Sequence, residues 1–271
     1  MIEFRNVTFS IGDREILINI SFLVPRGQTR VILGPSGSGK STILRLLMGL
    51  WHPDTGSIFV NGEDITQATP ERLREVRKSM GMVFQQGALF DSMTVGENIG
   101  YTLLEDKHAE EEIEQAVATY LAQVGLDPEL RDRMPDELSG GMQRRVAIAR
   151  ALAARNPEII LYDEPTTGLD PQSAERITDL IVHLRDTMGK TSIMVTHDIA
   201  DAFKVGNRIT VLDRGMVVFE GSPEELNAAS DPFIEEFLAP FRKAVAAATR
   251  RMTDGPGRRE PGTRPQPGGA L

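Results

Sequence analysis

Apolar and polar positions alternate over several short stretches of the chain, and longer amphipathic stretches lie between them. Residues 2–9 and 15–24 have the period of two that is typical of half-buried strands, and Gly12-Asp13 between them predicts a turn. Residues 29–33 form a short run of the buried-strand type that ends at a glycine. The same patterns predict further short strands at residues 57–60, 81–84, 159–162, 192–195, 209–212 and 216–219.

The clearest helical period lies at residues 108–124. One face of this stretch is apolar and carries Ile113, Val117, Tyr120, Leu121 and Val124, and the opposite face carries Glu110, Glu111, Glu112 and Glu114. Residues 42–50 and 144–154 predict two more helices. Because strands alternate with helical stretches, the sequence predicts an α/β fold with a mostly parallel sheet covered on both faces.

Composition places the chain among ordinary globular proteins. It has 271 residues, of which 40% are hydrophobic and 25% are charged. The absence of cysteine excludes disulfides, zinc-thiolate sites and iron–sulfur clusters, so any metal would be held by oxygen or imidazole. A formal net charge of −9 argues against nucleic acid as a partner, because affinity for nucleic acid comes mostly from neutralised phosphates.

The sequence shows neither the pattern of a secretory signal nor that of a membrane-spanning helix. Residues 1–5 lack the apolar run of a secretory signal, and no run of about 18 apolar residues occurs that could span a bilayer, so we expect a cytoplasmic protein.

Residues 241–271 form a basic tail rich in proline and glycine that is expected to be disordered. This tail either stays solvated or contacts anionic lipid head groups.

A phosphate-binding loop follows the strand at residues 29–33. Its sequence is Gly34-Pro35-Ser36-Gly37-Ser38-Gly39-Lys40-Ser41, with Thr42 next, and it matches the pattern G-x-x-x-x-G-K-[ST] between a strand and a helix. The backbone N–H groups and the helix start direct partial positive charge at phosphates. Lys40 would reach the β- and γ-phosphates and Ser41 would bind Mg²⁺, so the loop indicates a nucleoside triphosphate site.

Two later strands end in candidate catalytic residues. Asp163-Glu164 follows the apolar run 159–162, where Asp163 is placed to hold Mg²⁺ and Glu164 to act as the general base toward water. His197 ends another apolar strand, at the carboxyl edge where open α/β sheets bind ligands. Ser139-Gly140-Gly141 begins the helix at 144–154 and predicts a second anion site.

In their order and spacing, the loop 34–41, Gln85, the stretch 138–143, Asp163-Glu164, Gly168-Leu169-Asp170 and His197 resemble the ATP-binding subunit of ABC transporters. The resemblance covers residues 1–225, and no long coiled-coil insertion follows the loop. It implies an ABC ATPase domain over residues 1–240. That domain would have an antiparallel N-terminal β subdomain and an inserted helical subdomain at about residues 90–156.

The resemblance also implies a role for each matching residue. Gln85 would contact Mg²⁺ and the γ-phosphate region, and His197 would contact the γ-phosphate. Ser139, Gly140 and Gly141 would bind the γ-phosphate of ATP held by a second copy of the chain, and Asp170 would couple the two sites. The implied assembly is therefore a head-to-tail homodimer that encloses two molecules of ATP with Mg²⁺.

One position departs from the family pattern. The family usually has an aromatic residue in the first hairpin that stacks on adenine, and this chain has Ile11 there. Stacking on an aromatic side chain is worth about 1–3 kcal/mol per base in nucleic-acid sites. We therefore expect weak discrimination between ATP and GTP.

The stretch Gly87-Ala88-Leu89-Phe90, together with Ile11, resembles the ATPase of Mla or MCE-type systems, which transport phospholipids or other lipids. That resemblance implies an integral-membrane permease and an MCE-domain lipid-binding subunit as partners. It also implies a peripheral position on the cytoplasmic face of the bacterial inner membrane. Leu89 and Phe90 would receive a helix of the permease, or else fill the core.

Two other functions stay open at this point. The first is the ATPase of an importer for amino acids or another small solute, which belongs to the same family. The second is an ABC ATPase without a permease that acts on DNA or ribosomes. Such proteins usually have paired ATPase halves or a coiled-coil insertion, and this chain has one set of motifs and neither addition.

Overall fold

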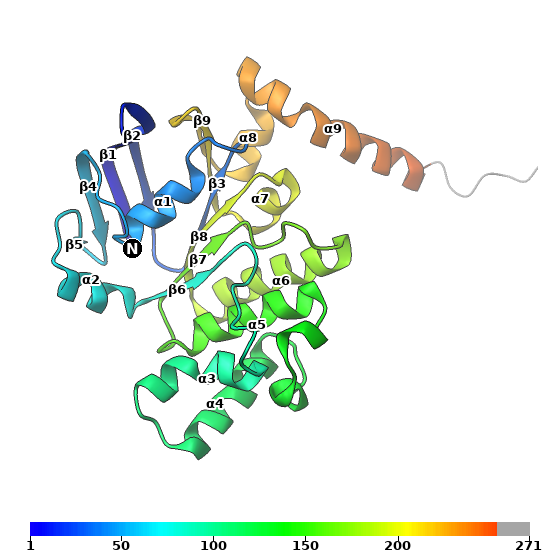
Figure 1. Ribbon diagram of the computed structural model, residues 1–271. Helices are drawn as coiled ribbons and strands as arrows, with labels where there is room; N and C mark the ends of the chain where they lie inside the picture. Colours follow the sequence, from blue (N-terminus) through cyan, green and yellow to red (C-terminus); the bar gives the residue numbers. More distant parts are fainter. Residues whose placement is uncertain (254–271) are drawn as a thin grey trace, which may run out of the picture. The chain divides into compact units, whose positions relative to one another are not determined.

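The computed structural model describes residues 1–253 of the chain. One unit spans Met1–Ala228, and a second unit begins at Ala229. The strands of the described residues all belong to the first unit, where they build two separate sheets (Figure 1). The candidate site residues named above also fall in this unit.

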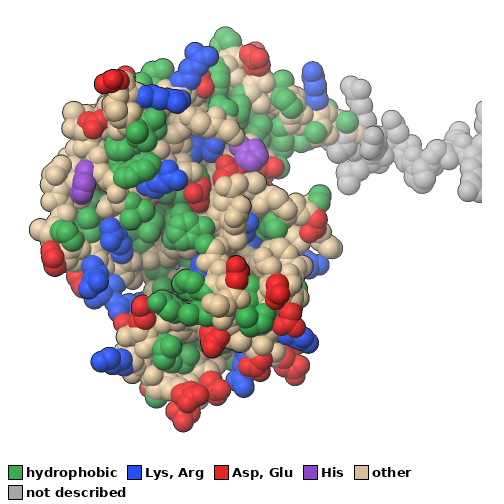
Figure 2. Space-filling model, viewed as in Figure 1, with side chains coloured by type: hydrophobic (Ala, Val, Ile, Leu, Met, Phe, Trp, Pro, Cys, Tyr) green, Lys and Arg blue, Asp and Glu red, His purple; other side chains and the backbone are tan. Residues whose placement is uncertain are grey.

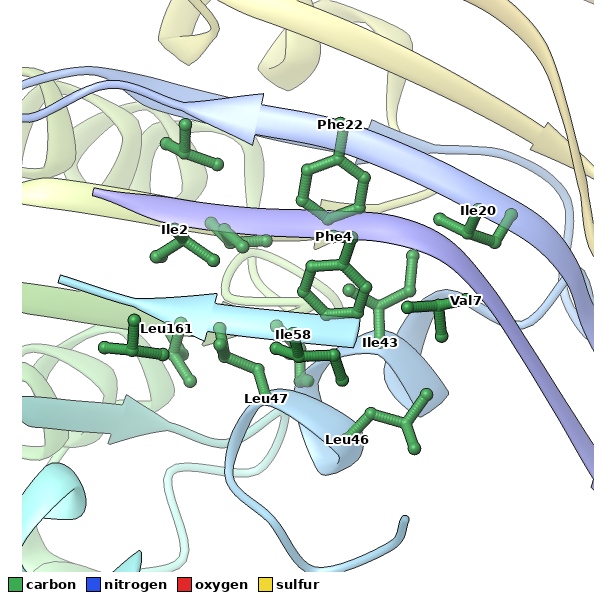
Figure 3. Packing of buried hydrophobic residues seen from close by; sticks show 14 of the residues in the cluster. Ile2, Phe4, Val7, Ile20, Phe22, Ile43, Leu46, Leu47, Ile58 and Leu161 are labelled. Atoms are coloured by element: carbon green, nitrogen blue, oxygen red, sulfur yellow. The ribbon is translucent and has the colours of Figure 1, made fainter. Parts of the chain in front are cut away.

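The smaller sheet is antiparallel, with the strand order β2-β1-β4-β5. Its strands are β1 (Ile2–Ile11), β2 (Arg14–Val24), β4 (Thr55–Val60) and β5 (Glu63–Asp64). The buried face of this sheet packs against helix α1 (Lys40–Leu47), and Phe4 stacks on Phe22 with 4.6 Å between ring centroids (Figure 3). The expected antiparallel N-terminal subdomain is confirmed.

The larger sheet has six strands in the order β10-β9-β3-β8-β7-β6. Its strands are β3 (Thr29–Leu33), β6 (Met80–Val83), β7 (Ile159–Asp163), β8 (Thr191–Thr196), β9 (Arg208–Asp213) and β10 (Met216–Gly221). Only β10 is antiparallel to its neighbour, where the β9–β10 hairpin closes the edge of the sheet. The mostly parallel core sheet that the sequence predicts is therefore confirmed.

The strand order decides which loops meet. Strands β3, β8 and β7 are adjacent and parallel, so their carboxyl ends share one edge of the sheet. These strands consist almost entirely of buried residues because other elements cover both faces of the sheet. Their shared edge therefore brings together the phosphate loop, Asp163-Glu164 and His197.

Between β6 and β7 the chain is helical. This part contains α3 (Val95–Glu105), α4 (Glu110–Gln123), the 3₁₀ helices η1 (Pro128–Asp132) and η2 (Pro135–Glu137), and α5 (Gly140–Ala153). Helix α4 buries Val117 and Leu121 and exposes its glutamates, as its period predicts. Acidic side chains gather at the lower end of Figure 2, where α3 and α4 lie in Figure 1.

The remaining helices complete the described chain. Helix α2 (Pro70–Arg77) precedes β6, α6 (Pro171–Met188) follows β7, and α7 (Ile199–Val205) follows β8. Helix α8 (Pro223–Ala228) ends the first unit, and α9 (Pro232–Thr253) belongs to the second. Among residues 1–253 no helix is both long enough and apolar enough to cross a membrane.

Some boundaries differ from the prediction. Helix α1 begins at Lys40 instead of residue 42, directly after its N-cap Gly39, and α5 begins at Gly140 instead of residue 144, because Gly140 and Gly141 already belong to its first turn. Helix α9 contains Pro240 and continues to Thr253, so it crosses the domain boundary expected at residue 240. Most of the expected tail, residues 254–271, lies outside the described residues, and its disorder stays a prediction.

Leu161 tests the packing of the large sheet. Its side chain is fully buried at the centre of β7 (Figure 3), so we expect Leu161→Ala to lower the free energy of unfolding by about 2–5 kcal/mol. Leu104 is 67% exposed, and Leu104→Ala should change the same quantity by less than about 0.5 kcal/mol. Urea denaturation measures both, and equal losses would contradict this account of the core.

Candidate active site

The phosphate loop is sterically fixed by its glycines. A Cβ on Gly34 would lie 2.2 Å from the carbonyl oxygen of Leu212 in β9, which no side chain tolerates. Gly39 caps α1 with a φ of +103°, and a Cβ there would lie 2.7 Å from the side chain of Leu17. The loop thus turns tightly from β3 into α1 and directs the helix start toward a hollow over the phosphate loop. This hollow is lined by Ile11, Arg14, Ile16, Gly37, Gly39, Lys40, Ser41, Thr42, Arg45 and Trp51.

Lys40 is the buried cation of this loop. Its side chain is 6% exposed, and Nζ donates to the carbonyl oxygens of Gly34 at 2.9 Å and Pro35 at 3.0 Å. Burial lowers the pKa of Lys40, and the carboxylate of Glu164, 3.7 Å from Nζ, acts in the opposite direction. An ammonium group that is only partly compensated in a buried position favours a polyanionic ligand such as a phosphate chain.

Ser41 and Asp163 form a pair of oxygen donors. The Ser41 hydroxyl donates to Asp163 Oδ1 at 2.9 Å, and burial raises the pKa of Asp163. A hydroxyl and a carboxylate suit Mg²⁺, which prefers oxygen ligands and completes its shell with water and substrate phosphates. Among residues 1–253 no group of three or more His, Cys, Asp or Glu side chains could hold a metal by itself. The pair therefore fits Mg²⁺ brought with a nucleotide.

Glu164 has an unusual backbone. Its φ is +49°, in the left-handed region, which costs a residue with a side chain about 1–2 kcal/mol. Its N–H donates to the carbonyl of Val195 in β8 at 2.9 Å, which ties it to the neighbouring strand. Such a conformation persists only where the surroundings fix it, and it is typical of functional sites.

The carboxylate of Glu164 is held at the same edge of the sheet. Oε2 accepts a hydrogen bond from Thr167 Oγ1 at 2.9 Å and lies 2.7 Å from Nδ1 of His197. The Glu164 side chain is 12% exposed, whereas that of His197 is 54% exposed. Glu164 is thus fixed between the buried Lys40 and a histidine that faces solvent.

The second predicted anion site lies in a different hollow. Ser139 is the N-cap of α5, and its Oγ accepts from the N–H of Met142 at 3.3 Å. A Cβ on Gly141 would lie 2.7 Å from the Ser173 hydroxyl, so α5 and α6 approach closely there. The hollow beside this helix start is lined by Gln85, Gln86, Gly140, Gln143, Arg144, Thr167, Gly168 and Leu169.

The predicted site residues therefore form two groups. The loop, Asp163, Glu164 and His197 come together through direct contacts. Gln85 and Gly140 line the other hollow, which shares no lining residue with the hollow over the phosphate loop. Asp170 caps α6, where the bond from Ser173 lowers its pKa, and it contacts neither Lys40 nor Glu164.

Sequence reasoning missed several residues at the site. Arg14 lines the hollow over the phosphate loop together with Trp51 and with Ile11, whose side chain is 54% exposed. Arg14 lies directly after the Gly12-Asp13 turn, close in sequence to Ile11. Its place in this first hairpin was the signal that could have identified it as a residue near the nucleotide. The preference between ATP and GTP stays a prediction.

Asp201 is a further missed residue. It lies in the first turn of α7 and accepts a hydrogen bond from Thr166, two residues after Glu164. Burial raises the pKa of Asp201 to about 6, and the bond from Thr166 acts in the opposite direction. No sequence pattern marks this aspartate, because its burial depends on packing between the ends of β7 and β8.

These features define a class of protein. A phosphate loop between a buried strand and a helix, with an acidic pair at the end of a parallel strand, is the arrangement of a P-loop nucleoside triphosphatase. The family model described as ABC transporter matches residues 17–167. The chain therefore belongs to the ABC transporter family and is an ATPase.

Similar proteins cover most of the chain. The intermembrane phospholipid transport system ATP-binding protein MlaF of Haemophilus influenzae is 41% identical over 239 residues, which are 88% of this chain and 90% of that protein. The Fe(3+) ions import ATP-binding protein FbpC of Escherichia coli O157:H7 is also 41% identical, over 225 residues, which are 83% of this chain and 63% of that protein.

A solved structure confirms the fold. The dimeric post-hydrolysis structure of the ATP-binding cassette MJ0796, bound to ADP and Pi, is 36% identical to this chain and has a TM-score of 0.74. The match covers 82% of this chain and 99% of the MJ0796 chain. The two-sheet arrangement described above is therefore that of an ABC ATPase cassette.

Asp201 gives the stability of the protein a pH dependence. Between about pH 4 and 6 the folded state retains a proton that an unfolded aspartate has released, so the free energy of unfolding falls as the pH rises. Asp201→Asn keeps a hydrogen-bond acceptor for Thr166 but does not titrate. We expect its melting temperature, relative to the unsubstituted protein, to rise from pH 4 to pH 7. If the difference in melting temperature between the two proteins stays constant from pH 4 to pH 7, the Asp201 carboxylate is not the source of the pH dependence.

Proposed function

We propose that ATP hydrolysis by this chain powers phospholipid transport through a separate integral-membrane permease. The observation that carries this proposal is the extent of the match: MlaF aligns over 90% of its length, whereas FbpC has the same identity over only 63% of its length. The chain would bind as a peripheral subunit on the cytoplasmic face of the bacterial inner membrane. An MCE-domain lipid-binding subunit would complete the system.

The surface around Phe90 supports a permease contact. Phe90 and Phe84 are each 42% exposed, and together with Met82 and Tyr101 they line a shallow hollow beside α5. The Phe90 ring lies 5.2 Å from the Tyr101 ring. Leu89 is partly buried, so of the two residues expected to receive a permease helix, Phe90 offers the larger apolar surface.

The chemistry follows from the residues at the carboxyl edge of the sheet. Lys40 and the N–H groups of the loop bind the phosphate chain and neutralise its charge. Ser41 and Asp163 would hold Mg²⁺, which when bound withdraws charge from the phosphate oxygens. Water attacks the γ-phosphorus, its proton passes to the Glu164 carboxylate, and ADP leaves. His197 orients Glu164 through the 2.7 Å contact and would meet the γ-phosphate.

A second copy of the chain would complete each site. Gly140 lines a hollow that does not include Lys40 of its own chain. Ser139, Gly140 and Gly141 would therefore bind the γ-phosphate of ATP held by the other copy. Gln85 would approach Mg²⁺, and Asp170 would couple the two sites, once the two chains close. The dimer of MJ0796 supports this arrangement. ATP binding would close the pair, and hydrolysis would open it.

A small-solute importer remains the second candidate, because FbpC is as identical to this chain as MlaF is. In that case the same ATPase would serve a permease that receives its cargo from a solute-binding protein.

Glu164→Gln tests the general base. The amide cannot take the proton of water, so we expect kcat to fall by about 10²–10⁴-fold while ATP binding and closed dimers persist. Lys40→Ala is the matched contrast, because it removes the buried cation and should lose affinity for ATP itself. Turnover near the unsubstituted rate in Glu164→Gln would remove Glu164 from this role, and full ATP affinity in Lys40→Ala would contradict the phosphate clamp.

Purification from the native membrane distinguishes the two cargo classes. An affinity-tagged chain should bring down an integral-membrane permease together with an MCE-domain protein, both identified by mass spectrometry. A permease accompanied by a solute-binding protein, with no MCE-domain protein, would contradict lipid transport and favour the importer.

A further inference from the structure

Arg144 in the second turn of α5 is a buried guanidinium between two backbone segments. It is 5% exposed, and NH1 donates to the carbonyl oxygen of Phe84 at 3.1 Å and to that of Glu164 at 3.3 Å. Burial lowers its pKa, and among residues 1–253 no carboxylate forms an ion pair with it. The guanidinium therefore makes charge-assisted hydrogen bonds to two carbonyl groups and orients them.

The bond to Glu164 acts on the residue whose backbone is left-handed. The Glu164 N–H donates to Val195 in β8, and the Glu164 carbonyl accepts from Arg144 of α5 at 3.3 Å and from the N–H of Thr167 at 3.3 Å. Of the two donors to this carbonyl, Arg144 is the one that comes from another helix. These bonds fix the peptide groups on both sides of the Glu164 Cα. Arg144 therefore contributes to the direction in which the carboxylate points toward Lys40 and His197, and it does so from outside the loop that follows β7.

The bond to Phe84 reaches the other hollow. Phe84 directly precedes Gln85, and the segment that leaves β6 runs past the start of α5 (Figure 1). Further along α5, Arg150 donates to the carbonyl oxygens of Gly87 at 2.9 Å and Ala88 at 2.7 Å. Helix α5 thus donates hydrogen bonds to both ends of the segment 84–88. Of these two arginines of α5, Arg144 is the one that also donates to Glu164.

We propose that Arg144 is a positioning residue that links the segment 84–88 and the start of α5 to the backbone of Glu164. A displacement of α5 or of this segment, such as permease docking or dimer closure would produce, changes the orientation of the Glu164 carbonyl and with it the orientation of its carboxylate. This inference rests on the proposed role of Glu164 in hydrolysis. It adds a route by which that role is controlled from outside the phosphate loop.

Arg144→Lys tests the link, because lysine keeps the charge but lacks the planar guanidinium that spans two carbonyls. Steady-state hydrolysis of Mg-ATP by the full chain should show kcat lower by about tenfold or more, with KM for ATP changed by less than about twofold. Arg145→Lys is the matched control, because Arg145 lies on the same helix and donates to Gly125 at 2.7 Å, away from both hollows. The control should keep the unsubstituted kcat.

A double substitution separates positioning from a general loss of structure. If Arg144 acts through Glu164, Arg144→Lys should lower the residual rate of Glu164→Gln by less than about twofold, because the two changes are then not additive. An equal kcat in Arg144→Lys and Arg145→Lys, a parallel change of kcat and KM, or full additivity with Glu164→Gln would each overturn the proposal. Should Arg144→Lys fail to fold, Arg144→Gln is judged by the same criteria.

These outcomes are distinct from failure of the proposed function. Unchanged turnover in Glu164→Gln alone removes the general base, whatever Arg144 does. A large loss in Glu164→Gln with no effect of Arg144→Lys keeps the base and removes only the link.

Discussion

The phosphate loop and the start of α5, the second predicted anion site, open into separate hollows, and this separation constrains how ATP can be hydrolysed. Lys40 lies at the edge of the large sheet, whereas Gly140 lines a hollow with Gln85 and Thr167. Two helix starts that each favour a phosphate cannot meet the same phosphate within one rigid chain. Under the proposed function, a partner must supply what each site lacks, and a second copy of the chain is the simplest such partner.

Glu164 is connected to both hollows, through its carboxylate to one and through its backbone to the other. The order of strands β3, β8 and β7 places its carboxylate near Lys40 and His197. Its backbone, however, is bonded to Arg144, which lines the other hollow. A left-handed conformation persists only where its surroundings fix it, so a movement of β8 or of α5 changes the bonds that hold the backbone of Glu164.

Much of this could be predicted from the sequence. The phosphate loop, Asp163-Glu164 and His197 follow buried strands, and parallel strands bring their carboxyl ends to one edge. Helix α2 was missed because Pro70–Arg77 is strongly polar and buries only Leu73 and Val76. Arg144 was missed because its role depends on the carbonyls of Phe84 and Glu164, which are distant in sequence and which no local pattern marks. Helix α9 extends past Pro240, where proline normally interrupts a helix.

The most direct test of the central claim is the dependence of ATP turnover per chain on protein concentration, measured without a permease while mass photometry records the fraction of paired chains. If each site needs residues from two chains, turnover per chain rises with the paired fraction and vanishes at dilutions where only single chains exist. A single chain that hydrolyses ATP at the full rate at such dilutions would contradict the account.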